Sequence, residues 1–272
     1  MKVALVQQPA TTDRAANVAK GLAAVAKAAG AGAGVVCFAE LAFDRFLPQE
    51  RAKKGDKTRA ESVPGPTTEP FRDAARLHRV VIVLNVFERD GDATYDCSPV
   101  IDADGEISGR SRMVHVPDFE CFHERGYYDP GDLAPAVFST RAGRIGVAIC
   151  YDRHYPEYMR ALAMTEPDLV VVPQAGALDE WPPGLFEAEM RAAAFQNGYY
   201  VALCNRVGRE ERIEFAGESF FASPSGAIVA KAGRGTEELL FADIDPQEVR
   251  KSAARTYFLK DRRPELYRGW LD

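Results

Sequence analysis

The sequence lacks a long hydrophobic run: no window of about 18 residues is apolar throughout, as a membrane-spanning helix requires. The start, MKVALVQQPA, has no long apolar core after its lysine and no small-residue cleavage site, so we expect no secretory signal and a cytoplasmic location. The net charge is −6 and the two signs are mixed along the chain, unlike a nucleic-acid-binding surface. We therefore expect a soluble protein with no membrane or nucleic-acid partner.

Cysteine and histidine are scarce as well. The 5 cysteines form no CxxC pair, and an odd number spread through a long chain fits reduced thiols better than a disulfide framework. With only 4 histidines and no ligand-like spacing, a metal site is not expected. No linker rich in Pro and Ser divides the chain. The 272 residues, 46% of them hydrophobic, are therefore expected to form a single domain.

What the sequence does contain is an alternation of short apolar runs, typical of buried strands, with longer stretches of helical period. This pattern predicts a layered α/β fold of two sheets packed face to face with helices outside. Strands are expected at 3–7, 35–40, 80–88, 145–149, 168–173, 199–204, 219–223, 227–231 and 239–244. Helices are expected at 13–29, 69–78, 156–164 and 185–197, and a hairpin at 95–101 with 108–116.

The C-terminal tail, residues 255–272, is basic and aromatic and too polar for a core strand. It could be a flexible end. In that case the bulky side chains of Tyr257, Phe258, Tyr267 and Trp270 would be exposed without partners. Docking of the tail on a neighbouring subunit is the favoured interpretation, and it predicts a homodimer or a larger homo-oligomer.

Two reactive side chains occur where apolar sequence gives way to a loop. Glu40 ends the run VVCFAE and Cys150 ends the run GVAIC. In α/β sheets, ligands gather beyond the carboxyl ends of the strands. A thiol is a nucleophile as the thiolate, so Glu40 could serve as its base. Alternatively Cys150 is a small hydrophobe that closes a strand, as we expect for Cys37 and Cys204.

Five motifs, in this order, decide between these alternatives: FAELAF, HVPDF with HERGYYDPGD, GVAICYDRHYPEYMRAL, RAAAFQNGYYVALCNRVG and GESFFASPSG. Together they resemble the nitrilase, or carbon-nitrogen hydrolase, superfamily over nearly the whole chain, in its amidase and N-carbamoyl amidohydrolase branch. The resemblance implies a four-layer α-β-β-α sandwich that pairs into αββα-αββα in a dimer. It also implies cofactor-free hydrolysis of non-peptide C–N bonds by a cysteine, a glutamate, a lysine and often a second glutamate.

The resemblance assigns a role to each matching residue. Cys150 matches the nucleophile, and Glu40 matches the base that takes its proton and later activates water. Glu124, in HERGYY, matches the second glutamate; from the residues alone it reads as a surface carboxylate. The backbone N–H of Tyr151, which follows the nucleophile, is expected to donate to the oxyanion.

The family's lysine is absent, because its position holds Met113. A bulge or slip could bring Arg112 into the pocket, although neighbouring side chains of a regular strand face opposite ways. Another cation, Arg153 or His154, could partly replace the lysine. Otherwise the lysine has been replaced, naturally or by design, and the protein binds a small amide or a protein partner with impaired turnover.

The substrate is expected to be a small amide or N-carbamoyl compound. Arg153 in CYDRHYPE could clamp a substrate carboxylate, or it could pair with a neighbouring carboxylate. Glu180, Glu187 and Glu218 fall near the expected pocket rim and would suit a cationic tail, unless they are merely solvated. Trp181 could form a wall of the pocket, or it could only anchor the WPPG turn.

Overall fold

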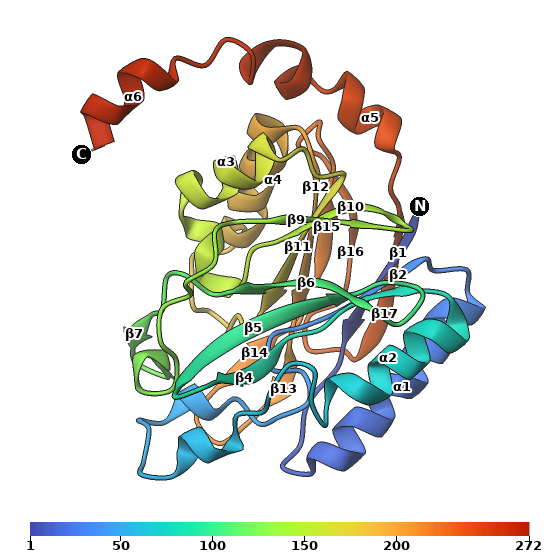
Figure 1. Ribbon diagram of the computed structural model, residues 1–272, viewed down its shortest axis with the longest axis vertical. Helices are drawn as coiled ribbons and strands as arrows, with labels where there is room; N and C mark the ends of the chain where they lie inside the picture. The colour runs from blue at the N-terminus through green and yellow to red at the C-terminus, as the bar shows by residue number, and fades with distance from the viewer. Residues whose placement is uncertain (272) are drawn as a thin grey trace.

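The computed structural model describes residues 1–271 and contains two β-sheets packed face to face between two helical layers (Figure 1). The first sheet has the order β17-β1-β2-β3-β5-β4, and β6 pairs with β5. Its strands are β1 (Lys2–Gln7), β2 (Val35–Phe38), β3 (Val81–Val83), β4 (Val86–Asp90), β5 (Ala93–Ile101), β6 (Ile107–Arg112) and β17 (Glu238–Asp243).

The second sheet has the order β16-β15-β12-β11-β10-β9. Each sheet has a parallel centre, formed by β1, β2 and β3 in the first sheet and by β10, β11 and β12 in the second. The strands of the second sheet are β9 (Val137–Thr140), β10 (Gly143–Val147), β11 (Leu169–Gln174), β12 (Tyr200–Asn205), β15 (Phe220–Ala222) and β16 (Ile228–Lys231).

Helices cover the outer face of each sheet. In β2, Val35 and Cys37 face the second sheet, whereas Val36 and Phe38 pack with residues of α1 and α2. The central strands are apolar on both faces because both faces are buried. This arrangement confirms the predicted α-β-β-α sandwich. The helices are α1 (Arg14–Gly30) and α2 (Thr68–His78) on the first sheet, and α3 (Pro156–Met164) and α4 (Leu185–Asn197) on the second.

Short elements complete the fold. None of residues 1–271 belongs to a helix with the length and apolar character needed to cross a bilayer. The C-terminal segment runs past α3 and α4, away from the sheets (Figure 1). Its Phe258 ring lies 5.4 Å from that of Phe195, while Tyr257 and Trp270 are 59% and 69% exposed. The short elements are β7 (Asp118–Phe119), β8 (Phe122–His123), β13 (Val207–Arg209), β14 (Glu214–Ala216), α5 (Pro246–Lys251), a π-helix (Ala254–Phe258) and α6 (Pro264–Leu271).

The predicted helices at 156–164 and 185–197 are confirmed to the residue, but the single strand predicted at 80–88 is wrong. The strand is interrupted between β3 and β4, because the Asn85 side chain turns inward. There Oδ1 accepts from the N–H of Leu41 at 2.8 Å, and Nδ2 donates to Ser98 at 3.1 Å and to Asp96. The interruption places the hydrogen-bonded side chain of Asn85 next to Leu41, just after the end of β2.

Helix α1 packs against three aromatic rings, those of Phe38, Phe43 and Phe71, whose centroids lie 4.8–5.3 Å apart. A Cβ at Gly21 would lie 2.7 Å from Phe43. Gly21→Ala is therefore expected to lower the free energy of unfolding by about 1–3 kcal/mol in urea denaturation, as overpacking does. Gly30→Ala is the matched control, since no atom lies within 4 Å of its added Cβ. Equal stabilities of the two variants would contradict the close packing.

Candidate active site

Cys150 lies on a tight turn after β10, at the start of a 3₁₀ helix (Cys150–His154). Its φ of +40° is in the left-handed region, which side chains rarely adopt. Arg153 is buried beneath the turn, where Nη1 donates to the Cys150 carbonyl at 2.9 Å and to Gln174 Oε1 at 2.7 Å. Arg153 thereby holds the turn that carries the thiol.

Glu40 follows β2 on a turn of the same construction. The next residue, Leu41, has a φ of +45°. The buried guanidinium of Arg206 donates through Nη1 to the carbonyls of Glu40, at 3.0 Å, and Leu41, and through Nη2 to the Asp44 carbonyl at 2.9 Å. Each of the two reactive residues is therefore held by a buried arginine that binds its carbonyl.

The packing of the sheets brings these two turns together, because β2 lies against β11 and β12. Burial raises the pKa of Glu40 to about 8, and the charge of Glu124 adds to the rise, while interactions with the Cys150 thiol and Asp96 lower it. Burial also raises the pKa of Cys150, and Glu40 and Glu124 add to that rise. The thiol of Cys150 and the carboxyl of Glu40 are therefore close enough for each to shift the pKa of the other, which is the arrangement expected of a nucleophile and its base.

Two further carboxyl groups lie near Glu40 and Cys150. Glu124, in a 3₁₀ helix (Glu124–Gly126), and Asp96, in the middle of β5, are fully buried. Burial raises the pKa of both, and neighbouring carboxylates raise them further: Asp96 acts on Glu124, and Glu40 on Asp96. Glu124 therefore lies at the site and not on the surface. The sequence reasoning missed Asp96, although an aspartate inside the apolar strand TYDCSPVI was a usable signal.

Arg112 does not replace the missing lysine, which corrects one alternative drawn from the sequence. Its Nε and Nη2 bind Glu88 at 2.7 and 3.0 Å, Nη2 binds Asp90 at 2.6 Å, and Nη1 binds Asp132 at 2.8 Å. The pairing of β5 with β6 shifts register between Val100 and Ile101, at the start of β6, and is regular at Arg112. Neighbouring side chains of a regular strand point to opposite faces, so the Arg112 side chain points away from that of Met113.

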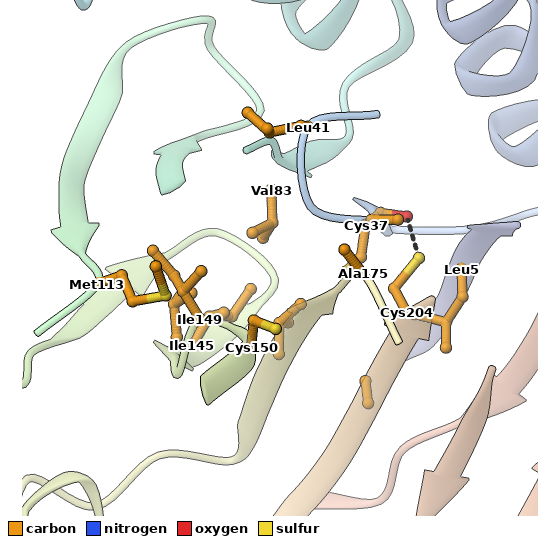
Figure 2. Close-up of a cluster of buried hydrophobic side chains, with 14 of the residues drawn as sticks. Leu5, Cys37, Leu41, Val83, Met113, Ile145, Ile149, Cys150, Ala175 and Cys204 are labelled. Carbon is orange, nitrogen blue, oxygen red and sulfur yellow. Dashed lines mark hydrogen bonds between the residues drawn. The ribbon is translucent and has the colours of Figure 1, made fainter. Parts of the chain in front are cut away.

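Met113 is 1% exposed, and Figure 2 draws it in the same buried cluster as Ile145, Ile149 and Cys150. Its backbone N–H donates to the Asp96 carbonyl at 2.9 Å. The side chain brings the site neither a charge nor a hydrogen-bond donor.

The other two cations considered differ in their position. Arg153 is close enough to lower the pKa of Cys150, although burial and carboxylates outweigh it. His154 places Nδ1 2.5 Å from Glu189 and packs edge-on against Trp181. Arg153 is therefore the guanidinium that acts on the thiol.

The three acidic residues expected at the pocket rim have different hydrogen-bond and ion-pair partners. Glu180 accepts the Ala177 N–H at 3.0 Å and its charge raises the pKa of Glu124. Glu187 and Glu218 instead bind Lys231 Nζ at 2.5 and 2.7 Å. These two carboxylates and Trp181 line a cavity of about 260 Å³. The structure thus brings Glu218 and Trp181 together there, with the carboxylate paired.

The remaining cysteines do not join the site as reactive groups. Cys37 and Cys204 are buried between the sheets, where the Cys204 thiol donates to the Cys37 carbonyl at 3.4 Å (Figure 2). All five cysteines are free thiols. Within residues 1–271 no group of three His, Cys, Asp or Glu side chains is placed to hold a metal ion.

A cysteine and a glutamate on facing strand ends of an α-β-β-α sandwich define the nitrilase-superfamily class of hydrolases. The chain belongs to the carbon-nitrogen hydrolase family, whose model matches residues 2–254. It is 33% identical to an N-carbamoylputrescine amidase of Solanum lycopersicum, over 99% of this chain and 94% of the relative. Family membership supports hydrolysis of amide C–N bonds.

Solved structures agree with this assignment. A carbon-nitrogen hydrolase from Helicobacter pylori G27 superposes with a TM-score of 0.91 at 28% identity, over 100% of this chain and 98% of that one. A glutamate-to-glutamine mutant of an amidase from Nesterenkonia sp. AN1 superposes at 0.85 with 26% identity, over 100% and 97% of the chains. That structure shows covalent addition of the acetamide moiety of fluoroacetamide at the active site cysteine.

The raised pKa of Glu40 predicts the pH dependence of activity. Glu40 is expected to accept the thiol proton and must be ionised to do so, so we predict that kcat/KM for a neutral amide rises with pH to a plateau, with a midpoint near pH 8. Glu40→Gln should remove this limb and lower kcat/KM by about 10²- to 10⁴-fold. Glu237→Gln, on an exposed carboxylate, is the control. A limb that persists in Glu40→Gln would belong to another group.

The same group predicts a pH dependence of stability with the opposite sign. Between its ordinary pKa of 4.5 and about 8, Glu40 keeps a proton in the folded chain that the unfolded chain releases. The free energy of unfolding should therefore fall as pH rises through this window. Urea denaturation at several pH values should show a shallower fall in Glu40→Gln, and an unchanged slope would contradict the assignment.

Proposed function

We propose that this chain hydrolyses the C–N bond of a small amide or N-carbamoyl compound through a thioester on Cys150. Glu40 takes the thiol proton as the sulfur attacks the carbonyl carbon, and returns it to the departing ammonia or amine. Glu40 then activates the water that releases the acid. The observation that carries this proposal is that Glu40 and Cys150 are both buried on turns that follow strands of the two packed sheets, near enough for each to shift the pKa of the other.

Other residues of the site receive proposed roles. The N–H of Tyr151 is proposed to donate to the oxyanion, and the N–H of Ala175, which faces the thiol, is a second donor. Glu124 is proposed to orient the substrate. Arg153 was considered as a clamp for a substrate carboxylate, but its bond to the Cys150 carbonyl supports a positioning role better.

The 260 Å³ cavity, whose lining does not include Cys150, Glu40 or Glu124, is proposed to hold the part of the substrate remote from the reacting carbon. Trp181 and Glu218 line it and are proposed as substrate-binding residues. The N-carbamoylputrescine amidase relative supports a carbamoyl compound among the candidates. A cytoplasmic location remains part of the proposal.

The thioester mechanism predicts a covalent intermediate. Incubation with small amides and N-carbamoyl compounds is expected to release ammonia and to leave, in rapidly quenched samples, an acyl mass on Cys150 in intact-protein and peptide mass spectrometry. Cys150→Ala should abolish both signals. Cys121→Ala is the control, because Cys121 is the partly exposed thiol of the chain. Neither ammonia nor adduct across the panel would favour the alternative of a binding protein.

The C-terminal tail supports a proposed homodimer. A groove of about 960 Å³ runs between α3, α4 and the tail, and Met164 and Tyr267 line it. Light scattering after size exclusion is expected to give twice the 29.9 kDa of one chain. Trp270→Ser should weaken the dimer, whereas Leu77→Ser, 76% exposed on α2, should not. The mass of a single chain in the unmodified protein would contradict the proposal.

A further inference from the structure

The centre of the site holds three carboxyl groups that lack donors. No N–H group among residues 1–271 donates to either side-chain oxygen of Glu40 or Glu124, or to Oδ2 of Asp96, and all five oxygens are buried. Asn85 satisfies the other oxygen of Asp96. Buried polar atoms in native proteins are nearly always bonded, so this group of oxygens indicates a ligand that brings N–H donors.

The two neighbouring guanidinium groups, those of Arg206 and Arg153, donate hydrogen bonds to other atoms and not to these carboxyls. Arg206 gives its Nη groups to backbone carbonyls and to Glu210 Oε1 at 2.5 Å. Arg153 donates through Nη1 to the Cys150 carbonyl and to Gln174. No lysine or arginine within residues 1–271 donates a hydrogen bond to the three carboxyls. A cationic ligand with N–H donors would therefore stabilise the ionised form of these carboxyls, which burial disfavours.

The side chain at position 113 adds a second, independent constraint. Attack of a thiolate on a neutral amide creates an oxyanion, which requires donors or a cation. Attack on a cationic C–N group instead gives a neutral tetrahedral adduct, which requires neither. The buried Met113, beside Cys150 in the core cluster, cannot stabilise an oxyanion, but it accommodates a neutral adduct.

We propose that the reacting carbon of the substrate belongs to an amidinium or guanidinium group, whose N–H donors bind the unpartnered oxygens of Asp96 and Glu124. The planar N–C–N unit can pair with carboxylates through parallel hydrogen bonds, and its charge offsets theirs. This inference rests on the proposed Cys150 and Glu40 chemistry and extends it from neutral to charged C–N bonds.

The reaction of an amidinium balances without a further reagent. The Cys150 sulfur bonds to the amidinium carbon while its proton passes to Glu40. The C=N π electrons move to nitrogen, giving a neutral adduct with two amino groups. Glu40 returns the proton to one of them, the C–N bond breaks and ammonia leaves a cationic thioimidate. Water adds as Glu40 takes its proton, the C–S bond breaks, and the products are the amide, ammonium and the free thiol.

The test compares three probes by ammonia release: butyramide, butyramidine and 4-aminobutyramide. The first two differ only at the reacting group, and the third carries its charge on the tail. We expect kcat/KM for butyramidine to exceed that for butyramide by roughly 100-fold, the size of one lost charge-stabilising partner. Equal rates, or a preference for either amide, would overturn the inference.

Substitutions of Asp96 and Glu124 test whether these carboxyls cause the preference for butyramidine. Asp96→Asn and Glu124→Gln should each lower the ratio of kcat/KM for butyramidine to kcat/KM for butyramide by roughly 100-fold. Asp73→Asn and Glu237→Gln, on exposed carboxylates, should leave both rates unchanged. Thermal melting checks that each variant is folded. An amidine preference that survives in folded Asp96→Asn and Glu124→Gln would overturn the inference.

Substitution of Met113 is a second test of the substrate preference, in which the carboxyl groups stay unchanged. Met113→Lys should favour butyramide over butyramidine, and Met113→Leu should keep the original order. An unchanged order in folded Met113→Lys would count against the inference. Hydrolysis of butyramide without amidine preference would refute this inference and leave the proposed function standing. Absence of ammonia and of any Cys150 adduct with all three probes would refute both.

Discussion

The site depends on two buried arginines that bind backbone carbonyls where strands of opposite sheets end. Arg206 holds the turn of Glu40 and Leu41, and Arg153 holds the turn of Cys150. Both turns contain a residue with left-handed φ, a conformation that costs about 1–3 kcal/mol and persists where surrounding contacts enforce it. The guanidinium bonds fix the two turns from which the Glu40 carboxyl and the Cys150 thiol project.

Burial has a second effect, on the protons of the site. Glu40, Asp96 and Glu124 all have raised pKa values, because water is excluded and because each carboxylate disfavours ionisation of the others. The site therefore favours neutral acids and a neutral thiol. A positive charge near these carboxyls would favour their ionisation.

Much of the architecture could be predicted from the sequence, because apolar runs and helical periods report burial directly. Helices α3 and α4 were predicted to the residue, and Glu40 and Cys150 stand out as polar residues that close apolar runs. The break at Asn85 could not be read, since an apolar run does not reveal that one amide inside it turns inward to bind Leu41.

Side-chain direction is the other quantity that the sequence left open. Arg112 and Met113 are neighbours, and only the regular pairing with β5 and the carboxylates around Arg112 show which of them faces the thiol. Asp96 was missed for a similar reason: within a strand, an aspartate can face solvent or the core. The burial of Glu124 depended on the loop after β8, whose path no local pattern specifies.

The environment of Cys150 has a consequence for the durability of the protein. Peroxide and other oxidants attack the thiolate far faster than the thiol, and they need access to the sulfur. Here the sulfur is nearly enclosed and its proton is held by the surrounding acids, with 5% of the residue exposed. Both properties are expected to slow irreversible oxidation of this thiol to sulfinic or sulfonic acid.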